Sequence, residues 1–348
     1  MNERLFFGVI TSVCIVAFVV GIWHVSMVLI FLMSAASVIL LARLIGQATE
    51  ALGTWFGSGV GALLGATFGN SVELIIALLA LRAGLYSVVK ATVIGGIMAN
   101  LLLTLGVCMI VAGFKTSVQK FSRVKAGVNS AMLFVAVIGL SVTSMYAMLN
   151  HGVHHVQAFS VGVAIVLLLV YIMGSVFSLF THRSFLTPDV SPVEKSKWSA
   201  RKAMIVLMLS TVLVSYFSDE LVGTVHPLAV HLGLSQEFIG LVFLPLIGIT
   251  PELFIAVLLA RRNQMDGSVE IAVGSSLQIA LFVGPVLVIA GAFMHQLFTL
   301  VFTPTEAIVL FLSTILISLV SLDGETHWFE GMMVLSTYVI FAMLFFFQ

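Results

Sequence analysis

Two glutamates lie inside long apolar runs of this sequence. Glu73 ends the segment Gly-Asn-Ser-Val-Glu that begins at Gly69, and Glu252 ends the segment Gly-Ile-Thr-Pro-Glu that begins at Gly248. A charged side chain at membrane depth costs about 2.5–3.5 kcal/mol on insertion scales, so acids in such places mark ion pathways and binding sites. We therefore expect a cation site at Glu73 and Glu252. The structural alternative is a pair of neutral acids that hydrogen-bond between helices.

Residues beside the two glutamates offer further oxygen ligands. Asn70 and Glu73 are three residues apart and share one face of a helix. Pro251 has no N–H, so it leaves carbonyl oxygens free to ligate a cation just before Glu252. Oxygen ligands with two carboxylates match a divalent ion such as Ca2+, whereas Mg2+ gives up its water reluctantly. When the metal leaves, two neighbouring carboxylates in a poorly solvated place favour protons, which predicts cation/proton exchange.

The composition places these residues in a polytopic membrane protein. Of the 348 residues, 60% are hydrophobic and 9% are charged, which is typical of a chain surrounded by a lipid bilayer. Apolar runs of about 18–25 residues, enough to cross ~30 Å of hydrocarbon, begin near Leu5, Ser26, Gly59, Ala91, Asn129, Ala158, Ala203, Glu237, Val269, Thr305 and Trp328. The runs predict an all-α membrane protein of about 11 transmembrane helices. The first is expected to be a retained helix, because no cleavage pattern follows it.

The chain divides into two similar halves. An offset of 179 places Gly69 on Gly248, Glu73 on Glu252 and Arg82 on Arg261. We expect four parts: an N-terminal transmembrane helix (1–24), a first five-helix repeat (25–181), a cytoplasmic linker rich in proline and charge (182–202), and a second five-helix repeat (203–348). Five spans per repeat invert one half relative to the other, which is the architecture of alternating-access transporters with a site near the midplane.

A second pair of matching segments follows the glutamates. Residues 95–100 read Gly-Gly-Ile-Met-Ala-Asn and residues 274–279 read Gly-Ser-Ser-Leu-Gln-Ile, so each half has small residues followed by an amide. Asn100, Ser275 and Gln278 are candidate ion-pathway residues. Hydrogen bonding between helices is an equally good interpretation of Asn100 and Gln278.

Two further acids lie near the starts of apolar spans. Acidic side chains suit helix N-termini, so we expect Glu270 and Glu330 to cap helices rather than to relay protons.

The basic residues predict the orientation. With the N-terminus in the cytoplasm, every Lys and Arg except Arg82 and Lys90 falls on the cytoplasmic side, as the positive-inside rule requires. Eleven spans then put the C-terminus outside. A net charge of zero gives no indication of a nucleic-acid partner. We expect the cytoplasmic membrane of a bacterium, and the sequence does not decide between a monomer and a homo-oligomer.

Three motifs resemble those of a known transporter family. The segments at residues 69–73, 274–278 and 328–331 are similar to motifs of the cation/proton exchangers, the Ca2+/H+ antiporters of the cation/Ca2+ exchanger superfamily, and the similarity covers nearly the whole chain. The resemblance implies eleven helices and proton-driven Ca2+ extrusion, with no cofactor besides the transported ion. It also implies the following ligands: the side chains of Glu73, Glu252 and Asn70, and backbone oxygens at Gly69 and Gly248.

The second motif departs from the family pattern Gly-Asn-Ala-Ala-Glu-His. Ile249 replaces the amide, Thr250 and Pro251 replace two alanines, and Leu253 replaces the histidine. Thr250 is a candidate oxygen ligand in place of the lost amide. The Pro-Glu pair is similar to the sodium/calcium exchangers, so a sodium-coupled or other cation exchanger of the same superfamily is the alternative function.

Two functions from other classes use the same polar residues. A cation channel uses similar oxygen ligands but does not require inverted repeats. An intramembrane hydrolase would need a base beside Ser275 or Ser276, and the spans offer no convincing partner.

Overall fold

Eleven helical segments account for almost all of the residues that the structure describes. The computed structural model describes residues 3–23, 25–57, 61, 64, 65, 67–149, 153–178 and 198–348. In chain order the helices are α1 (Glu3–Ile22), α2 (Met27–Phe56), α4 (Ser71–Arg82), α5 (Tyr86–Met98) with the π-helical turn η1 (Ala99–Thr104) and α6 (Leu105–Gly113), α7 (Arg123–Leu149), α8 (Val153–Val176), α10 (Ala200–Leu232), α11 (Gln236–Phe238) with η3 (Ile239–Phe243) and α12 (Leu244–Arg261), α13 (Met265–Gln278) with η4 (Ile279–Val283) and α14 (Gly284–Phe293), α15 (Pro304–Val320) and α16 (Trp328–Phe346).

Most of these segments are long enough to span a bilayer. Within the described residues, nine are long and apolar enough to cross a membrane, and α15 is a shorter apolar helix. The two-residue strands β1 (Gln119–Lys120) and β2 (Glu325–Thr326) pair as a small antiparallel sheet. The predicted all-α membrane fold is confirmed. Several helices begin a few residues before the apolar run, as α7 does at Arg123 and α13 at Met265.

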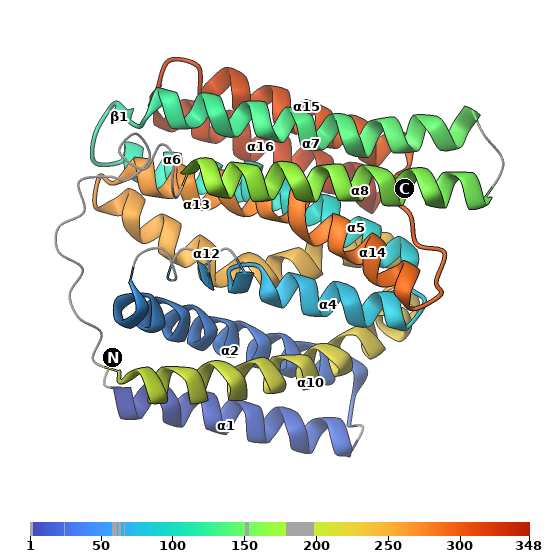
Figure 1. Ribbon diagram of the computed structural model, residues 1–348. Coiled ribbons are helices and arrows are strands. Elements are labelled where there is room, and N and C mark those ends of the chain that lie inside the picture. Colours follow the sequence, from blue (N-terminus) through green and yellow to red (C-terminus); the bar gives the residue numbers. More distant parts are fainter. Residues whose placement is uncertain are drawn as a thin grey trace.

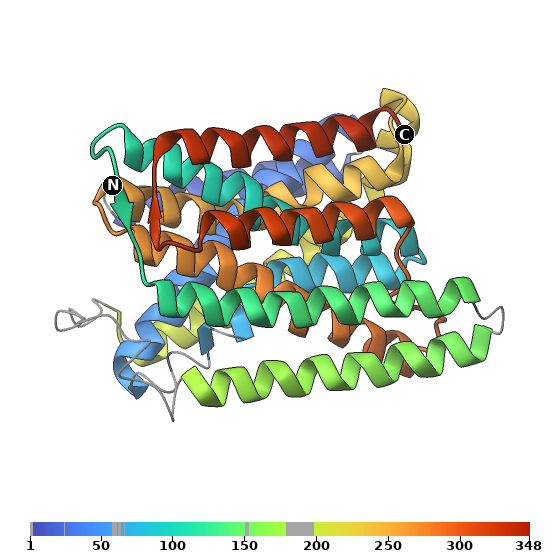
Figure 2. The same cartoon turned by 90° about the horizontal axis from the view of Figure 1, so that it is seen from above.

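The helices lie nearly parallel to one another in layers. In Figure 1, α4, α5, α12 and α13 lie between α1, α2 and α10 on one side and α7, α8, α15 and α16 on the other. The span that contains α5 is 83% buried, whereas the span of α8 is 17% buried, so α5 belongs to the protected centre and α8 to the periphery. Figures 1 and 2 show the two termini at opposite ends of the bundle, as an odd number of spans requires.

The predicted linker lies mostly outside the described residues, which resume at Trp198. The Ser199 hydroxyl accepts a hydrogen bond from the Lys202 N–H at 3.3 Å, and this N-cap starts α10 at Ala200. The indole Nε1 of Trp55 donates to the Trp198 carbonyl at 2.8 Å, which ties the start of α10 to the end of α2.

Two features relate the halves of the chain. The offset of 179 carries η1 onto residues 278–283, where η4 covers Ile279–Val283. In addition, the Ser276 hydroxyl donates to the Ile97 carbonyl at 3.3 Å, and the same offset makes these two positions equivalent. Equivalent positions touch where a pseudo-two-fold axis passes between two repeats. The division into inverted repeats stays a prediction that these features favour.

Candidate cation-binding site

The two glutamates predicted from separate halves lie close together. Glu73 is the third residue of α4 and only 5% exposed, while Glu252 follows Pro251 within α12. A β-carbon on Gly248 would lie 2.7 Å from Glu73 Oε1, so the bare backbone of α12 is in contact with the carboxylate of α4. Glu252 lies four residues after Gly248 on α12 and therefore shares the helix face that contacts Glu73. Gly248 is therefore the position that lets the two acidic helices approach.

An amide bridge joins the same region to α13. Asn70 Nδ2 donates to Gln278 Oε1 at 2.7 Å, and a β-carbon on Gly69 would lie 3.2 Å from that oxygen. Ile249, which occupies the position of the second amide in the family pattern, is completely buried. The amide opposite Asn70 thus comes from Gln278 on the next helix rather than from the position equivalent to Asn70.

Buried acceptor atoms gather at this point without hydrogen-bond partners. Among the described residues these atoms are both carboxylate oxygens of Glu73, Oε2 of Glu252 and Oδ1 of Asn70. An unpaired buried acceptor costs about 1–3 kcal/mol, and ionised carboxylates are acceptor-only groups. The described residues contain no cluster of three His, Cys, Asp or Glu side chains that could hold a metal. A cation here must therefore combine the two carboxylates with amide, hydroxyl or backbone oxygens.

Two hydroxyl groups lie beside Glu252. Ser275 on α13 lines the same cavity as Glu252. The Thr250 hydroxyl donates to the Leu246 carbonyl one turn earlier, and its oxygen keeps lone pairs for another partner. Because Pro251 has no N–H, the carbonyl of Ile247 receives no helical hydrogen bond from it. This turn of α12 can therefore supply both side-chain and backbone oxygens.

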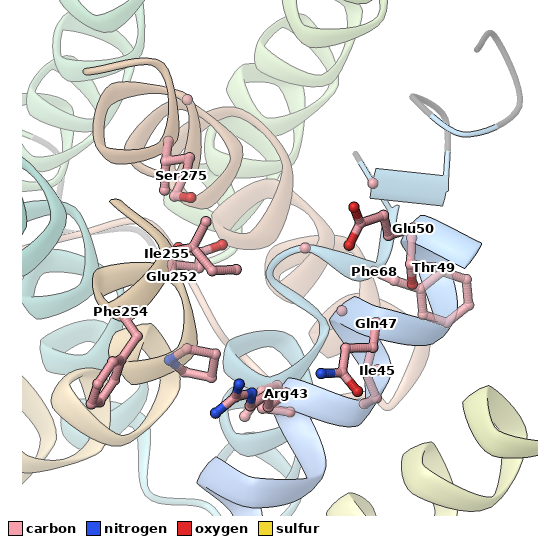
Figure 3. A pocket seen from close by; sticks show the side chains of 18 of the residues that line it. Arg43, Ile45, Gln47, Thr49, Glu50, Phe68, Glu252, Phe254, Ile255 and Ser275 are labelled. Atoms are coloured by element: carbon pink, nitrogen blue, oxygen red, sulfur yellow. The ribbon is translucent and has the colours of Figure 1, made fainter. Parts of the chain in front are cut away.

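A cavity of about 1200 Å³ reaches the site. Six of the predicted site residues line it: Gly69, Gly248, Thr250, Glu252, Ser275 and Gln278. Figure 3 shows Glu252 and Ser275 on the side opposite Thr49 and Glu50 of α2. Asn100 is not among the described lining residues; it lies fully buried in η1, and its amide atoms have no partner within the described chain.

The cavity wall includes polar residues that the sequence interpretation missed. Arg43, Gln47 and Glu50 line it from α2. Their spacing of i, i+4, i+7 puts them on one face of a helix, a pattern that could have revealed them. Glu270 also lines the cavity, and its predicted capping role is wrong, because α13 begins at Met265 and its first-turn acid is Asp266.

Glu330 behaves as predicted. It closes a capping box with His327 at the start of α16.

Comparisons with known proteins decide the family. The family model described as sodium/calcium exchanger protein matches residues 26–180 and 202–347. The Ca(2+)/H(+) antiporter ChaA of Bacillus subtilis (strain 168) is 38% identical over 348 residues, covering 99% of this chain and 99% of that protein. This chain belongs to the Ca2+/H+ antiporter family of the sodium/calcium exchanger superfamily. The Ca2+/H+ antiporter family consists of transporters, so the chain is a transporter rather than an enzyme, and the resemblance seen in the three motifs is confirmed.

Solved structures of antiporters have the same fold. The structure of native YfkE matches with a TM-score of 0.86 and 34% identity, covering 99% of this chain and 100% of that one. The crystal structure of the H+/Ca2+ exchanger CAX matches with a TM-score of 0.72 over 100% of this chain and 93% of the other. Its identity of 14% shows the shared fold alone.

Proposed function

We propose that this protein exchanges Ca2+ for protons across a membrane by alternating access, and that Glu73 and Glu252 bind both ions in turn. The observation that carries the proposal is the meeting of the two acids, one from each half, with buried acceptor atoms that have no partner among the described residues. The name of the Bacillus subtilis relative, a Ca(2+)/H(+) antiporter, supports the choice of ions.

The geometry supports a set of proposed ligands. Ca2+ accepts six to eight oxygens in flexible geometry, and two carboxylates balance its charge. Asn70 donates its Nδ2 hydrogen bond to Gln278, so Oδ1 of Asn70 remains available to the ion. Thr250 and the backbone at Gly69 and Gly248 complete the set. When Ca2+ leaves, Glu73 is too buried to remain an isolated charge, so protons on the carboxylates take the place of the metal.

The proposed orientation puts the cavity on the cytoplasmic side of a bacterial membrane. The cavity is lined by the end of α2 and by α13 from Glu270 onward, and α13 follows Arg261 and Arg262 in the sequence. Basic residues in short loops favour the cytoplasm. The N-terminus then lies inside and the C-terminus outside. The two segments matched by the family model support repeats at residues 25–181 and 203–348.

Flux measurements in proteoliposomes test the proposal against its alternatives. A pH gradient alone, without Na+, is expected to drive Ca2+ against its gradient, because protons replace the metal at the site. A sodium-coupled exchanger would instead need a Na+ gradient at equal pH. A channel would pass Ca2+ only down its own gradient.

Substitutions of the two glutamates test whether the measured Ca2+ flux depends on the proposed site. Glu73→Gln and Glu252→Gln are each expected to abolish exchange while the protein still inserts and melts cooperatively. Glu325→Gln, which removes a carboxylate paired with Lys120 outside the cavity, is the matched control and should transport normally. Near-normal exchange by either site variant would overturn the assignment.

A further inference from the structure

Glu270 is a cavity-lining carboxylate that the proposed binding chemistry does not use. It lies five residues before Ser275 on α13, about 7.5 Å of helix rise from it. Glu270, Gly274, Ser275 and Gln278 all line the cavity and follow one face of this helix. Moving along this wall from the start of α13, an ion meets Glu270 before it meets Ser275 and Gln278.

A lysine anchors this carboxylate at the wall. Lys125 Nζ lies 3.3 Å from Glu270 Oε2 and 3.2 Å from Asp266 Oδ2, and the lysine side chain is only 10% exposed. Asp266 is further engaged, because its Oδ1 accepts the Ser122 N–H at 2.8 Å. Glu270 is 53% exposed, against 36% for Asp266. One cation is thus shared by two carboxylates, and the excess negative charge faces the cavity through Glu270.

The described residues that line the cavity include three acids, Glu50, Glu252 and Glu270, and one base, Arg43. Arg43 lies above the Phe6 ring, with its guanidinium carbon 5.1 Å from the ring centroid. Glu50 adds a second acid from α2, and Glu252 adds a third at the inner end. A cleft lined mainly by one sign of charge raises the local concentration of the opposite ion.

We propose that Glu270 is an access residue for the transported cation: its carboxylate, anchored by Lys125, attracts the ion and contacts it on the way to and from Glu252. This inference rests on the proposed function. Glu270 assists capture and release, and it is not a ligand of the bound state. Its removal should therefore change the apparent KM for Ca2+ more than kcat.

The size of the effect follows from Coulomb's law. One charge acting on a divalent ion across about 10 Å of water changes its occupancy roughly three- to fourfold at low ionic strength. At about 0.15 M salt the Debye length is about 8 Å, and the same effect falls below about twofold. A packing defect has no reason to follow ionic strength in this way.

The test measures Ca2+ transport in proteoliposomes at low and at physiological ionic strength. Glu270→Gln should raise KM about three- to fourfold at low salt, by less than twofold at high salt, and leave kcat nearly unchanged. Glu270→Asp keeps the charge and should restore the wild-type KM. Glu325→Gln neutralises a carboxylate that is also paired with a lysine and is 46% exposed, but that lies outside the cavity lining. It should behave as wild type.

Three outcomes would overturn the inference. These are an unchanged KM in Glu270→Gln, an equal change in Glu325→Gln, or a change that does not depend on salt. Wild type and Glu73→Gln are measured in parallel. If wild type exchanges Ca2+ and Glu73→Gln does not, the proposed function stands even where the Glu270 variants overturn the access role.

Discussion

Gly248→Ala tests the close contact between the two halves of the site. A β-carbon at this position would lie 2.7 Å from Oε1 of Glu73 and 2.9 Å from its Cδ and Cγ. Ordinary contacts begin at 3.4 Å, so the substitution must move the carboxylate by about 0.7 Å, the difference between these distances. Metal–ligand distances tolerate only about 0.2 Å. The displaced oxygen therefore ceases to be a good ligand.

The loss can be expressed as an affinity. One ligand lost from a buried charged group is worth ~1–3 kcal/mol, which is roughly a 5- to 150-fold weaker Kd for Ca2+. Calorimetry on the purified protein measures this change, and thermal melting checks that the fold is retained. Gly274→Ala is the matched control, because Gly274 lines the same cavity and a β-carbon there would meet nothing within 4 Å. Equal Ca2+ affinities for the two variants would refute the contact argument.

Two further predictions concern the amide bridge and the proton. The effects of Asn70→Ala and Gln278→Ala on Ca2+ binding should not be additive, because each variant removes one end of the same 2.7 Å hydrogen bond. A double-mutant cycle by calorimetry should give a coupling energy of about 0.5–1.5 kcal/mol. A coupling energy of zero would contradict the amide bridge. Raising the pH should strengthen Ca2+ binding, since protons and Ca2+ compete for the same carboxylate oxygens, by up to about tenfold per pH unit for each proton released. Calorimetry in buffers of different ionisation enthalpy counts those protons, and an affinity that stays constant over roughly pH 5 to 9 would argue against proton coupling.

The fold was predictable because the membrane imposes simple rules on a sequence. Each span must be apolar and helical, so eleven runs could be read as eleven helices. The pairing of Glu73 and Glu252 could also be predicted from the sequence, because an acid in an apolar run is costly and the repeat offset relates the two positions. Apolar runs, buried acids and the repeat offset are local or periodic properties, and such properties can be identified from the sequence alone.

Contacts between different helices were harder to predict. Nothing in the spacing of Asn70 and Gln278 reveals that their side chains meet, because that depends on how α4 and α13 cross. Glu270 was mistaken for a cap because hydrophobicity alone placed the start of the span near Val269, whereas the polar residues from Met265 onward are already helical. The residues of α2 that line the cavity were missed because the helix continues to Phe56, past the apolar run.

The two acids do not have equivalent surroundings, and this difference is informative about the exchange cycle. Glu252 lies on the cavity wall, whereas Glu73 is only 5% exposed and contacts the backbone at Gly248. If the halves are inverted repeats, as proposed, the opposite conformation places Glu73 on the wall of a cavity at the other membrane face and buries Glu252. Each acid then faces water in only one of the two states. A carboxylate that loses its water needs Ca2+ or a proton before the cavity can close, and this requirement couples the two ions.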